Sequence, residues 1–373
     1  MKIGILTYWW SEDNYGQQLQ CYALQEYLRR LGHDPFLIRY DKRKDYPQSP
    51  MWVKCIKALN PIKLYHYFVF KIKNKMIAVE QSTHNRHFEE FREKYISQTE
   101  KIYYSYAELK NNPPEADVYI VGSDQVWNYT DYPQKDIHRA LSAYMLDFVP
   151  KGKKRIAYAA SWGLKAIDSK LKGEISLLLR GFSYISVREK SGVRICEDCG
   201  VQAEWVVDPT MLLPADTYRE LYRGTSVPEC KSKQYLLLYM LNNLQKYDVE
   251  PIYEFARKRN LDVVYITGNG VVDKRKKYFA TIPEWLYLID NAEYIVTNSF
   301  HCCVFSALFQ KKYGAVKLTG KNAGMNERLE SLFARFESIP RYIENNDFSA
   351  LDITPYSHIE SKFSKDFIDK ILL

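Results

Sequence analysis

The sequence predicts an α/β protein made of two Rossmann-like, doubly wound domains. Short apolar runs of strand length alternate with longer stretches in which apolar residues recur at helical spacing. This alternation occurs twice, on either side of a charged, proline-containing stretch near 213–232. A chain of 373 residues is also too long for one typical hydrophobic core. We therefore expect an N-terminal domain at 1–215, a C-terminal domain at 232–350 and a final helix within 351–373.

The first domain opens with an apolar strand at 1–7, a polar loop at 11–18 and a helical pattern at 19–32. Gly32 fits the position just after a helix end, where a left-handed backbone is common. Residues 34–40 form the next apolar run. A strand, a loop, a helix and a second strand in this order imply a parallel sheet covered by helices.

The rest of the first domain continues this alternation, with one unusual segment. No acidic residue occurs between Asp45 and Glu80, and lysines there are interleaved with aromatic residues. We interpret about 46–96 as a basic helical insertion. The other expected elements are strands within 117–123, 154–163, 184–189 and 203–213, and helices at 84–96 and 168–181.

The second domain repeats the pattern. Its expected strands are 235–241, 261–268, 293–298 and 312–318, and its expected helices are 251–260, 283–293, 299–312, 326–336 and 361–373. Ligands of doubly wound sheets bind outside the carboxyl ends of the strands. Two such domains in tandem would therefore face a shared cleft.

Composition and the absence of certain motifs limit the classes of function that the sequence supports. The net charge of +8 favours anionic substrates or surfaces without requiring either. Seven cysteines in this length do not suggest a disulfide framework, and neither a signal peptide nor a spanning segment is evident, so we expect a cytoplasmic protein. The single CxxC pair, Cys196 and Cys199, lacks a second pair, so we expect no metal. No recognition motif for nucleic acid and no GxGxxG motif occurs.

His301 is the residue on which the functional interpretation depends. It follows the strand that ends near Asn298, and Ser299 is a good N-cap for the next helix. His301 would then lie in the first helical turn, where free N–H groups and the helix dipole favour an anion. The alternative is a buried histidine whose ring is satisfied by a backbone carbonyl.

Polar residues follow several other predicted strands, where a ligand would bind. Asn14, Tyr15 and Gly16 come after the first strand, and Gly16 would allow the backbone to approach a ligand closely. An ordinary turn would explain them equally well. Ser123 and Asp124 follow the strand at 117–123, where Asp124 could hold or deprotonate a hydroxyl or simply cap a helix.

Three further positions complete the candidate site. Arg188 and Glu189 end a strand, and an arginine suits a carboxylate or phosphate, although a surface ion pair is the alternative. Asp208 precedes Pro209 as a cleft acid or a cap. Asn326 and Arg328 lie between a strand and a helix, in a phosphate-binding corner or a solvated loop.

In their order and spacing, these stretches resemble the polysaccharide pyruvyl transferases over roughly residues 1–341. The segments that carry the resemblance are N-Y-G-Q, V-G-S-D-Q-V-W-N, S-V-R-E, V-D-P-T and T-N-S-F-H. The resemblance implies a fold similar to the glycosyltransferase B architecture, phosphoenolpyruvate as donor and no separate cofactor. It implies a sugar acceptor in a surface-polysaccharide precursor and a cyclic pyruvate ketal as product. His301 matches the family histidine, and Arg188, Asp124 and Asp208 fall in matching motifs.

The sequence departs from this family at one position. Many members have arginine two residues before the histidine, where this chain has Ser299. Arg328, Arg341 or Lys317 could supply the missing cation. Two other functions stay open: a glycosyltransferase that uses a nucleotide sugar, and a non-catalytic sugar-binding relative.

The basic aromatic segment at 51–77 suggests a membrane partner. Acceptors in such pathways are often lipid-linked oligosaccharides, and a lysine-rich aromatic helix could rest on the anionic inner leaflet. The alternative is an insertion that packs on the first domain with its lysines in solvent.

Overall fold

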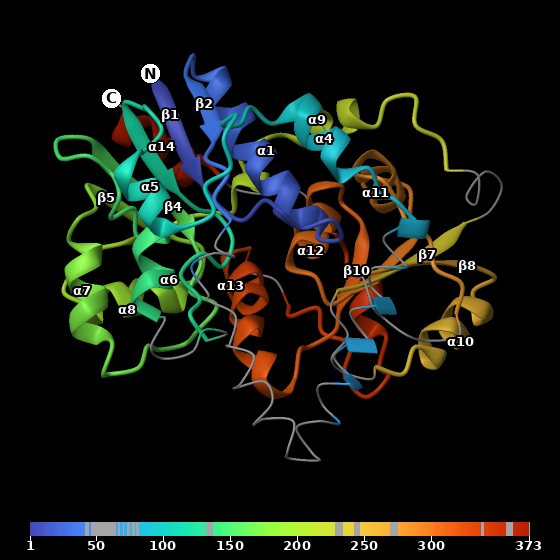
Figure 1. The fold of residues 1–373 in the computed structure, drawn as a ribbon. Helices are drawn as coiled ribbons and strands as arrows, with labels where there is room; N and C mark the ends of the chain where they lie inside the picture. Colours follow the sequence, from blue (N-terminus) through green and yellow to red (C-terminus); the bar gives the residue numbers. More distant parts are fainter. Residues whose placement is uncertain are drawn as a thin grey trace.

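The computed structural model describes residues 1–41, 45, 65, 68–69, 71–72, 75–76, 79, 82–130, 132, 137–227, 234–241, 247–268, 275–336, 339–355 and 361–372. The chain forms two parallel sheets, each covered by helices, which occupy opposite sides of the molecule (Figure 1). This arrangement confirms the predicted pair of doubly wound units.

The first sheet has six strands in the order β2-β1-β3-β4-β5-β6. Its strands are β1 (Lys2–Leu6), β2 (Asp34–Leu37), β3 (Val118–Val121), β4 (Lys154–Ala160), β5 (Tyr184–Val187) and β6 (Glu204–Trp205). The chain passes from β1 to β2 on one side and then crosses to β3 on the other side of β1. The loops after β1 and β3 therefore diverge at a topological switch point, where doubly wound sheets bind ligands.

The second sheet has four strands in the order β10-β9-β7-β8. Its strands are β7 (Tyr235–Met240), β8 (Asp262–Thr267), β9 (Tyr294–Thr297) and β10 (Lys312–Ala315). The strand β7 pairs with both β8 and β9, so the second switch point lies between β7 and β9. All six residues of β7 are buried, as expected for a central strand covered on both faces.

The helices agree with most of the predicted periodic segments. They are α1 (Tyr15–Arg30), α4 (Phe88–Tyr95), α7 (Lys172–Leu179), α8 (Lys190–Asp198), α10 (Glu250–Lys258), α11 (Ile282–Asp290), α12 (Phe300–Leu308), α13 (Glu327–Arg335) and α14 (Lys362–Leu372). Four helices were not predicted, namely α8 and the short helices α5 (Tyr106–Asn111), α6 (Ile137–Tyr144) and α9 (Ala215–Leu221). Each is nine residues or shorter, which is too short for an apolar period to be distinct.

The N-terminal end of α1 corrects the predicted loop at 11–18. The helix begins at Tyr15, because the side chain of Asn14 caps it by accepting a hydrogen bond from the N–H of Gln17. Gln17 and Gln18 are therefore helical and buried rather than part of a solvated loop. At the other end, Gly32 has φ +80° just beyond the C-cap, which confirms its predicted role.

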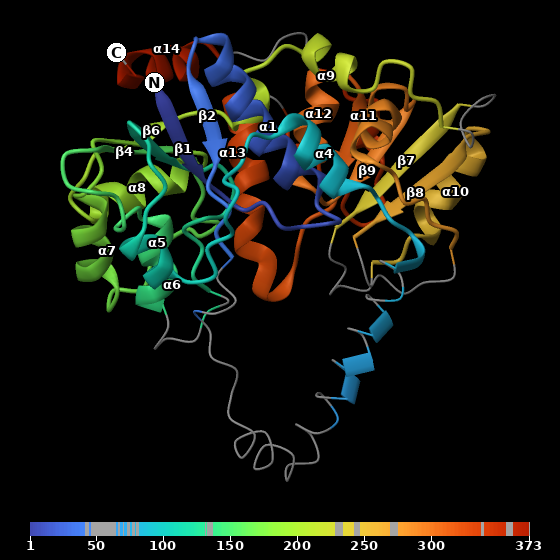
Figure 2. The ribbon, with the colours of Figure 1, turned by 45° about the horizontal axis from the view of Figure 1, so that its top comes forward.

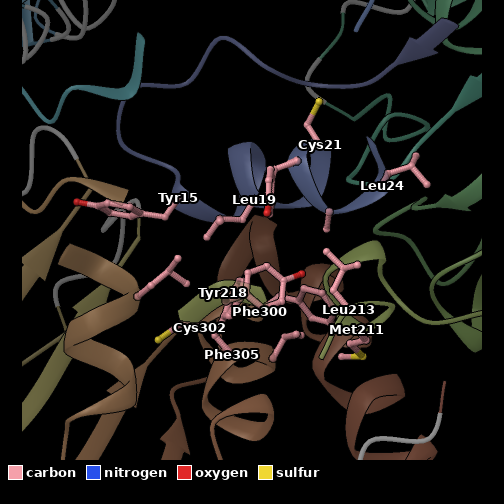
Figure 3. Packing of buried hydrophobic residues seen from close by; sticks show 14 of the residues in the cluster. Tyr15, Leu19, Cys21, Leu24, Met211, Leu213, Tyr218, Phe300, Cys302 and Phe305 are labelled. Carbon is pink, nitrogen blue, oxygen red and sulfur yellow. The ribbon is translucent and has the colours of Figure 1, made fainter. Parts of the chain in front are cut away.

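Helices α1 and α12 join the two sheets. Tyr15 stacks on Trp285 of α11, with ring centroids 5.0 Å apart, and its hydroxyl donates to the carbonyl of Ala280 at 2.7 Å. Figure 3 shows Leu19 of α1 facing the layer of Tyr218, Phe300 and Phe305. One continuous apolar cluster therefore runs from the first sheet into the second.

The C-terminal helix α14 returns to the first sheet. The N–H of Val207 donates to the hydroxyl of Ser364 at 3.0 Å, and Phe367 contacts the ring of Tyr158. Both ribbon views place α14 beside β1 and the N-terminus (Figure 1, Figure 2). The predicted domain limits of 1–215 and 232–350 remain predictions.

The predicted basic insertion at 46–96 lies largely outside the described residues. Those of its residues between 65 and 79 that the structure describes are helical and exposed. In the part of the chain that is described, no helix is long and apolar enough to cross a membrane.

Candidate active site

Asp208 is the centre of a buried polar cluster at the carboxyl edge of the first sheet. One carboxylate oxygen, Oδ2, accepts hydrogen bonds from Arg188 Nη1 at 2.7 Å and from the Ser123 hydroxyl at 2.9 Å. The other, Oδ1, accepts from the N–H and hydroxyl of Thr210, so Asp208 also caps the 3₁₀ helix Pro209–Met211. Of the two roles considered for Asp208, the structure confirms the cap, and the role of a cleft acid remains a prediction.

His301 reaches the same carboxylate from the second sheet. Ser299 caps α12 by accepting from the N–H of Cys302, which confirms the predicted N-cap and places His301 in the first turn. Its Nε2 lies 3.5 Å from Asp208 Oδ2. The two residues are 93 positions apart in the chain (301 − 208), and β9 and β6 belong to different sheets. The histidine is therefore not an isolated core residue, because its ring faces an ionised group.

Gly16 makes this approach of the histidine possible. A Cβ atom at position 16 would lie 2.1 Å from Nδ1 of His301 and 2.2 Å from its Cγ. We expected Gly16 to admit a ligand. That interpretation needs correction, because what the absent side chain admits here is the imidazole of His301.

Two more carboxylates surround Arg188. Asp124 Oδ1 lies 3.8 Å from Nη2, and Glu189 Oε1 lies 3.5 Å from Nε. Neither contact is a hydrogen bond, so Nε and Nη2 of Arg188 have no hydrogen-bond partner among the described residues. Arg188 is thus paired by charge but keeps two donors available for a ligand.

Burial and charge act in opposite directions in this cluster. Burial opposes ionisation of Asp208, but His301, Arg188 and Thr210 together hold the pKa of its carboxyl well below its ordinary value. For Glu189, burial outweighs Arg188 and raises the pKa. Burial also disfavours the charge of Arg188, yet the three carboxylates together raise its pKa. The cluster is therefore an ionised Arg188–Asp208 pair beside a less readily ionised Glu189.

A second arginine faces the same aromatic ring. The guanidinium of Arg188 lies 4.5 Å from the ring centre of Phe300, and that of Arg328 lies 5.8 Å from it. Burial and the charge of Arg188 lower the pKa of Arg328 to about 10. The two guanidinium groups repel each other, so an anion bound between them would stabilise both.

Asp124 has an unusual backbone conformation. Its φ of 67° lies in the left-handed region, which non-glycine residues seldom adopt, and the preceding Gly122–Ser123 peptide is cis. The carbonyl of Asp124 accepts hydrogen bonds from Val126 and Ser161, which hold the loop in place. A left-handed backbone at a non-glycine residue is more frequent at functional sites than elsewhere.

Several predicted ligand contacts instead have structural partners. The side-chain amides of Asn298 and Asn326 each exchange two hydrogen bonds with the backbone, at Leu241 and Leu318 respectively. Tyr15 is fully buried between the two sheets. Asn14 and Ser299 act as N-caps. These five residues therefore have structural roles in the fold around the site.

The remaining predicted residues come together. Ser123, Asp124, Arg188, Glu189, Asp208, His301 and Arg328 form one cluster. Sequence reasoning missed Phe300 and Ser161, whose hydroxyl donates to Glu189 at 2.5 Å. Phe300 directly precedes His301 and could have been suspected from that position, whereas nothing in the sequence distinguishes Ser161.

The site is closed in this structure. His301 and Arg188 are each 4% exposed and Asp208 is 1% exposed. The two cavities described, of about 670 and 450 Å³, lie elsewhere, the first near Gln234 and Asp262 and the second near Tyr22 and Tyr95. Neither of these two cavities is lined by a residue of the cluster around Asp208.

The sequence profile of a known family, described as "Polysaccharide pyruvyl transferase", matches residues 14–312. The match covers more than half of the chain and includes every residue of the cluster except Arg328. The chain belongs to the polysaccharide pyruvyl transferase family. No curated protein matches it significantly in sequence.

Solved structures with a similar fold share little sequence with this pyruvyl transferase family member. The UDP-GlcNAc 2-epimerase from Methanocaldococcus jannaschii, in complex with UDP-GlcNAc and UDP, superposes with a TM-score of 0.51 at 14% identity over 100% of this chain and 99% of its own. The corresponding enzyme from Rickettsia bellii gives 0.49 at 9% identity, covering 100% and 95%, and Arabidopsis thaliana UGT89C1 gives 0.45 at 8%, covering 99% and 93%. The fold is that of the glycosyltransferase B type.

The chemistry available at the site is binding of an anion and movement of protons. Cationic donors come from Arg188 and Arg328, and the titratable groups are His301, Asp208 and Asp124. Among the described residues, no group of three or more histidine, cysteine, aspartate or glutamate side chains could hold a metal ion.

Proposed function

We propose that the protein transfers a pyruvyl group from phosphoenolpyruvate to a sugar of a surface-polysaccharide precursor, forming a cyclic ketal. The observation that carries the proposal is the meeting of His301 and Arg188 at Asp208. It places the histidine of a pyruvyl transferase beside a guanidinium with two available donors.

The donor would lie between Arg188 and Arg328. Phosphoenolpyruvate carries a phosphate and a carboxylate, and arginine binds either group in a bidentate manner. Burial and repulsion from Arg188 lower the pKa of Arg328, and the charges of the donor would offset both. Of the three cations considered as replacements for an arginine at Ser299, Arg341 donates to the carbonyls of Ile353 and Thr354, and Lys317 pairs with Glu344. Arg328 is thus the replacement that this geometry favours.

His301 and Asp208 would supply the first proton. Protonated His301 gives its proton to C3 of the enol, which becomes a methyl group, and positive charge develops at C2. Asp208, 3.5 Å from Nε2, stabilises the imidazolium before transfer and orients its ring. A sugar oxygen then attacks C2, and Asp124 takes the proton of that hydroxyl.

Loss of phosphate and ring closure would complete the reaction. The bond between C2 and the phosphate oxygen breaks, and the oxygen keeps the electron pair. The second sugar hydroxyl closes the ring at C2 and returns a proton to His301. The proton held by Asp124 leaves with the phosphate. Two hydroxyl protons are consumed, one at C3 and one on phosphate, so the reaction balances without an oxidant.

Ketal formation by the purified protein tests this proposal. Incubation with phosphoenolpyruvate and a sugar acceptor should release phosphate and give a ketal methyl signal by NMR, and His301→Ala should abolish both while its thermal unfolding stays close to wild type. Near-native turnover by His301→Ala would remove His301 from the mechanism. Protection by a nucleotide sugar but not by phosphoenolpyruvate in thermal unfolding would favour the glycosyltransferase instead.

We also propose that the acceptor is lipid-linked and that the basic segment contacts the membrane. Phe68, Val69, Ile72 and Met76 are 44–58% exposed, and Lys71 and Lys75 accompany them. An apolar stripe with lysines suits an anionic leaflet. Vesicles that contain phosphatidylglycerol should float the wild-type protein at low salt and float Lys71→Glu/Lys75→Glu less. Absence of flotation by the wild type would end this idea.

A further inference from the structure

A second buried arginine lies outside the cluster around Asp208. Arg86 precedes α4 and is 3% exposed. None of its three guanidinium nitrogens has a hydrogen-bond partner among the described residues. Its guanidinium carbon lies 5.0 Å from the centre of the Phe279 ring, and the guanidinium also interacts with the hydroxyl of Tyr15. A buried guanidinium with all its donors unused is costly unless a ligand supplies acceptors.

Other unused donors lie beside Arg86. Burial raises the pKa of both Tyr15 and Tyr239, and the positive charge of Arg86 opposes the rise in both, so all three side chains are neighbours. The Tyr239 hydroxyl and the indole N–H of Trp285 are buried and have no partner among the described residues. The Tyr239 and Trp285 rings are in contact, with centroids 5.5 Å apart.

The position of this group suits a substrate of the same reaction. Tyr239 lies near the carboxyl end of β7, at the switch point of the second sheet. Tyr15 contacts both Tyr239 and Trp285, whereas the next residue, Gly16, lies against His301. The two groups of donors are therefore separated by little more than the first turn of α1.

The side chains of Arg86, Tyr239 and Trp285 determine which kind of ligand can bind beside them. Arginine and tryptophan only donate, so their partner must bring acceptor oxygens, and the guanidinium favours a negative charge. Asp13 is near enough to raise the pKa of Tyr239, but it forms no described ion pair with Arg86. A phosphate or a carboxylate on a sugar fits these requirements.

We propose that Arg86, with the hydroxyl of Tyr239, forms a subsite for an anionic group of the acceptor sugar. The identity of the ligand as the acceptor sugar rests on the proposed function. The binding of an anion at Arg86 does not. The donor occupies the Arg188 and Arg328 side of α1, and the anion of the acceptor occupies the Arg86 side, with the sugar hydroxyls between them.

Calorimetric titrations of the full chain test the subsite. The probes are glucose 1-phosphate, glucuronate and uncharged glucose, so a phosphate and a carboxylate are distinguished. The wild type should bind at least one anionic probe more tightly than glucose. Arg86→Gln should weaken that binding by about tenfold or more, Arg86→Lys should recover part of it, and Tyr239→Phe should weaken it less than Arg86→Gln.

Arg92→Gln is the matched control. Arg92 is equally buried, but its guanidinium donates to the carbonyl of Ser11 and pairs with Glu89, so its loss should leave probe affinity unchanged. Equal affinity of the wild type and Arg86→Gln for the anionic probes would overturn the subsite. So would a wild type that binds no anionic probe better than glucose, or a loss of phosphoenolpyruvate binding in Arg86→Gln. If the wild type failed to bind phosphoenolpyruvate while Arg86 still controlled sugar-phosphate binding, the subsite would stand and the proposed donor would fall.

Discussion

Arg188 and Arg86 are both buried, but their surroundings differ. Arg188 has three carboxylates within 3.8 Å, those of Asp124, Glu189 and Asp208. Arg86 has aromatic rings around it and no described ion pair. The first arginine is compensated by described carboxylates and therefore contributes to holding the fold, whereas the second has no ion-pair partner among the described residues.

This difference shows that burial and charge do not define a functional arginine without its partners. Removing one member of a buried ion pair leaves the other charges uncompensated, but removing an unpaired buried charge relieves a cost. The two arginines should consequently respond to the same substitution in opposite directions.

The largest effect on stability is expected from Arg188→Met. The substitution would remove the cation that hydrogen-bonds Asp208 and lies nearest to Asp124 and Glu189, so we expect a loss of about 3–5 kcal/mol in the free energy of unfolding. Urea unfolding followed by circular dichroism measures it. A loss below about 1 kcal/mol would mean that Arg188 is not a structural partner of Asp208.

Gly16→Ala tests how much the reaction depends on the position of the His301 ring, because it changes no charge in the cluster around Asp208. The new Cβ would meet the imidazole of His301, so the ring must move although every charged group remains. We expect a fall in ketal formation of about 100-fold, the order of effect that a displacement near 1 Å produces.

The control for this variant is Gly173→Ala. It lies in helix α7 with open space around its Cβ position, and it should leave activity unchanged and stabilise slightly. Equal activity of Gly16→Ala and the wild type would show that the packing of His301 against Gly16 is irrelevant to the reaction.

The pH dependence of stability should identify Asp208 as an ionised group. Its native pKa lies below its unfolded value, which is about 3.9, so it contributes stability above that pH and loses the contribution as the pH falls toward the native pKa. The difference in urea midpoint between the wild type and Asp208→Asn should be constant from about pH 5 to 8 and shrink below about pH 4. A difference that grew on acidification would contradict this assignment.

Arg86→Met should have the smallest effect and the opposite sign to Arg188→Met. We expect the free energy of unfolding to stay within about 1 kcal/mol of wild type or to rise, because the substitution removes a buried charge that has no ion-pair partner in the described part of the chain. Thermal and urea unfolding of the two methionine variants side by side give the comparison. A destabilisation as large as that of Arg188→Met would mean that Arg86 already has a strong partner in the folded protein.

The sequence was informative where a local rule applies. Apolar runs located the strands, the glycine after α1 marked its end, and Ser299 marked the start of α12. Local rules could not show that Asn298 and Asn326 are used to bridge backbone groups, since an exposed and a buried asparagine have the same letter. The role of Arg86 could not be predicted for the same reason. The sequence gives its charge, but it shows neither that the side chain is buried nor which groups surround it.

The site itself depended on contacts between distant segments. Asp208, Arg188 and His301 meet only because β5, β6 and β9 bring their ends to one place, which no periodicity within a segment encodes. The resemblance to a family supplied their grouping, and the structure supplied their distances. Neither the contact of Phe300 with two guanidinium groups nor the contact of Gly16 with His301 followed from the residues alone.

The central claim is that Arg188 and Arg328 bind the donor while Arg86 binds the acceptor. Titration of phosphoenolpyruvate into the wild type, Arg328→Gln and Arg86→Gln tests it most directly. The donor is expected to bind between Arg188 and Arg328, so Arg328→Gln should weaken its affinity by about tenfold or more, while Arg86→Gln should stay within about twofold of wild type. Full affinity in Arg328→Gln together with lost affinity in Arg86→Gln would contradict the account, because the donor would then occupy the site assigned here to the acceptor.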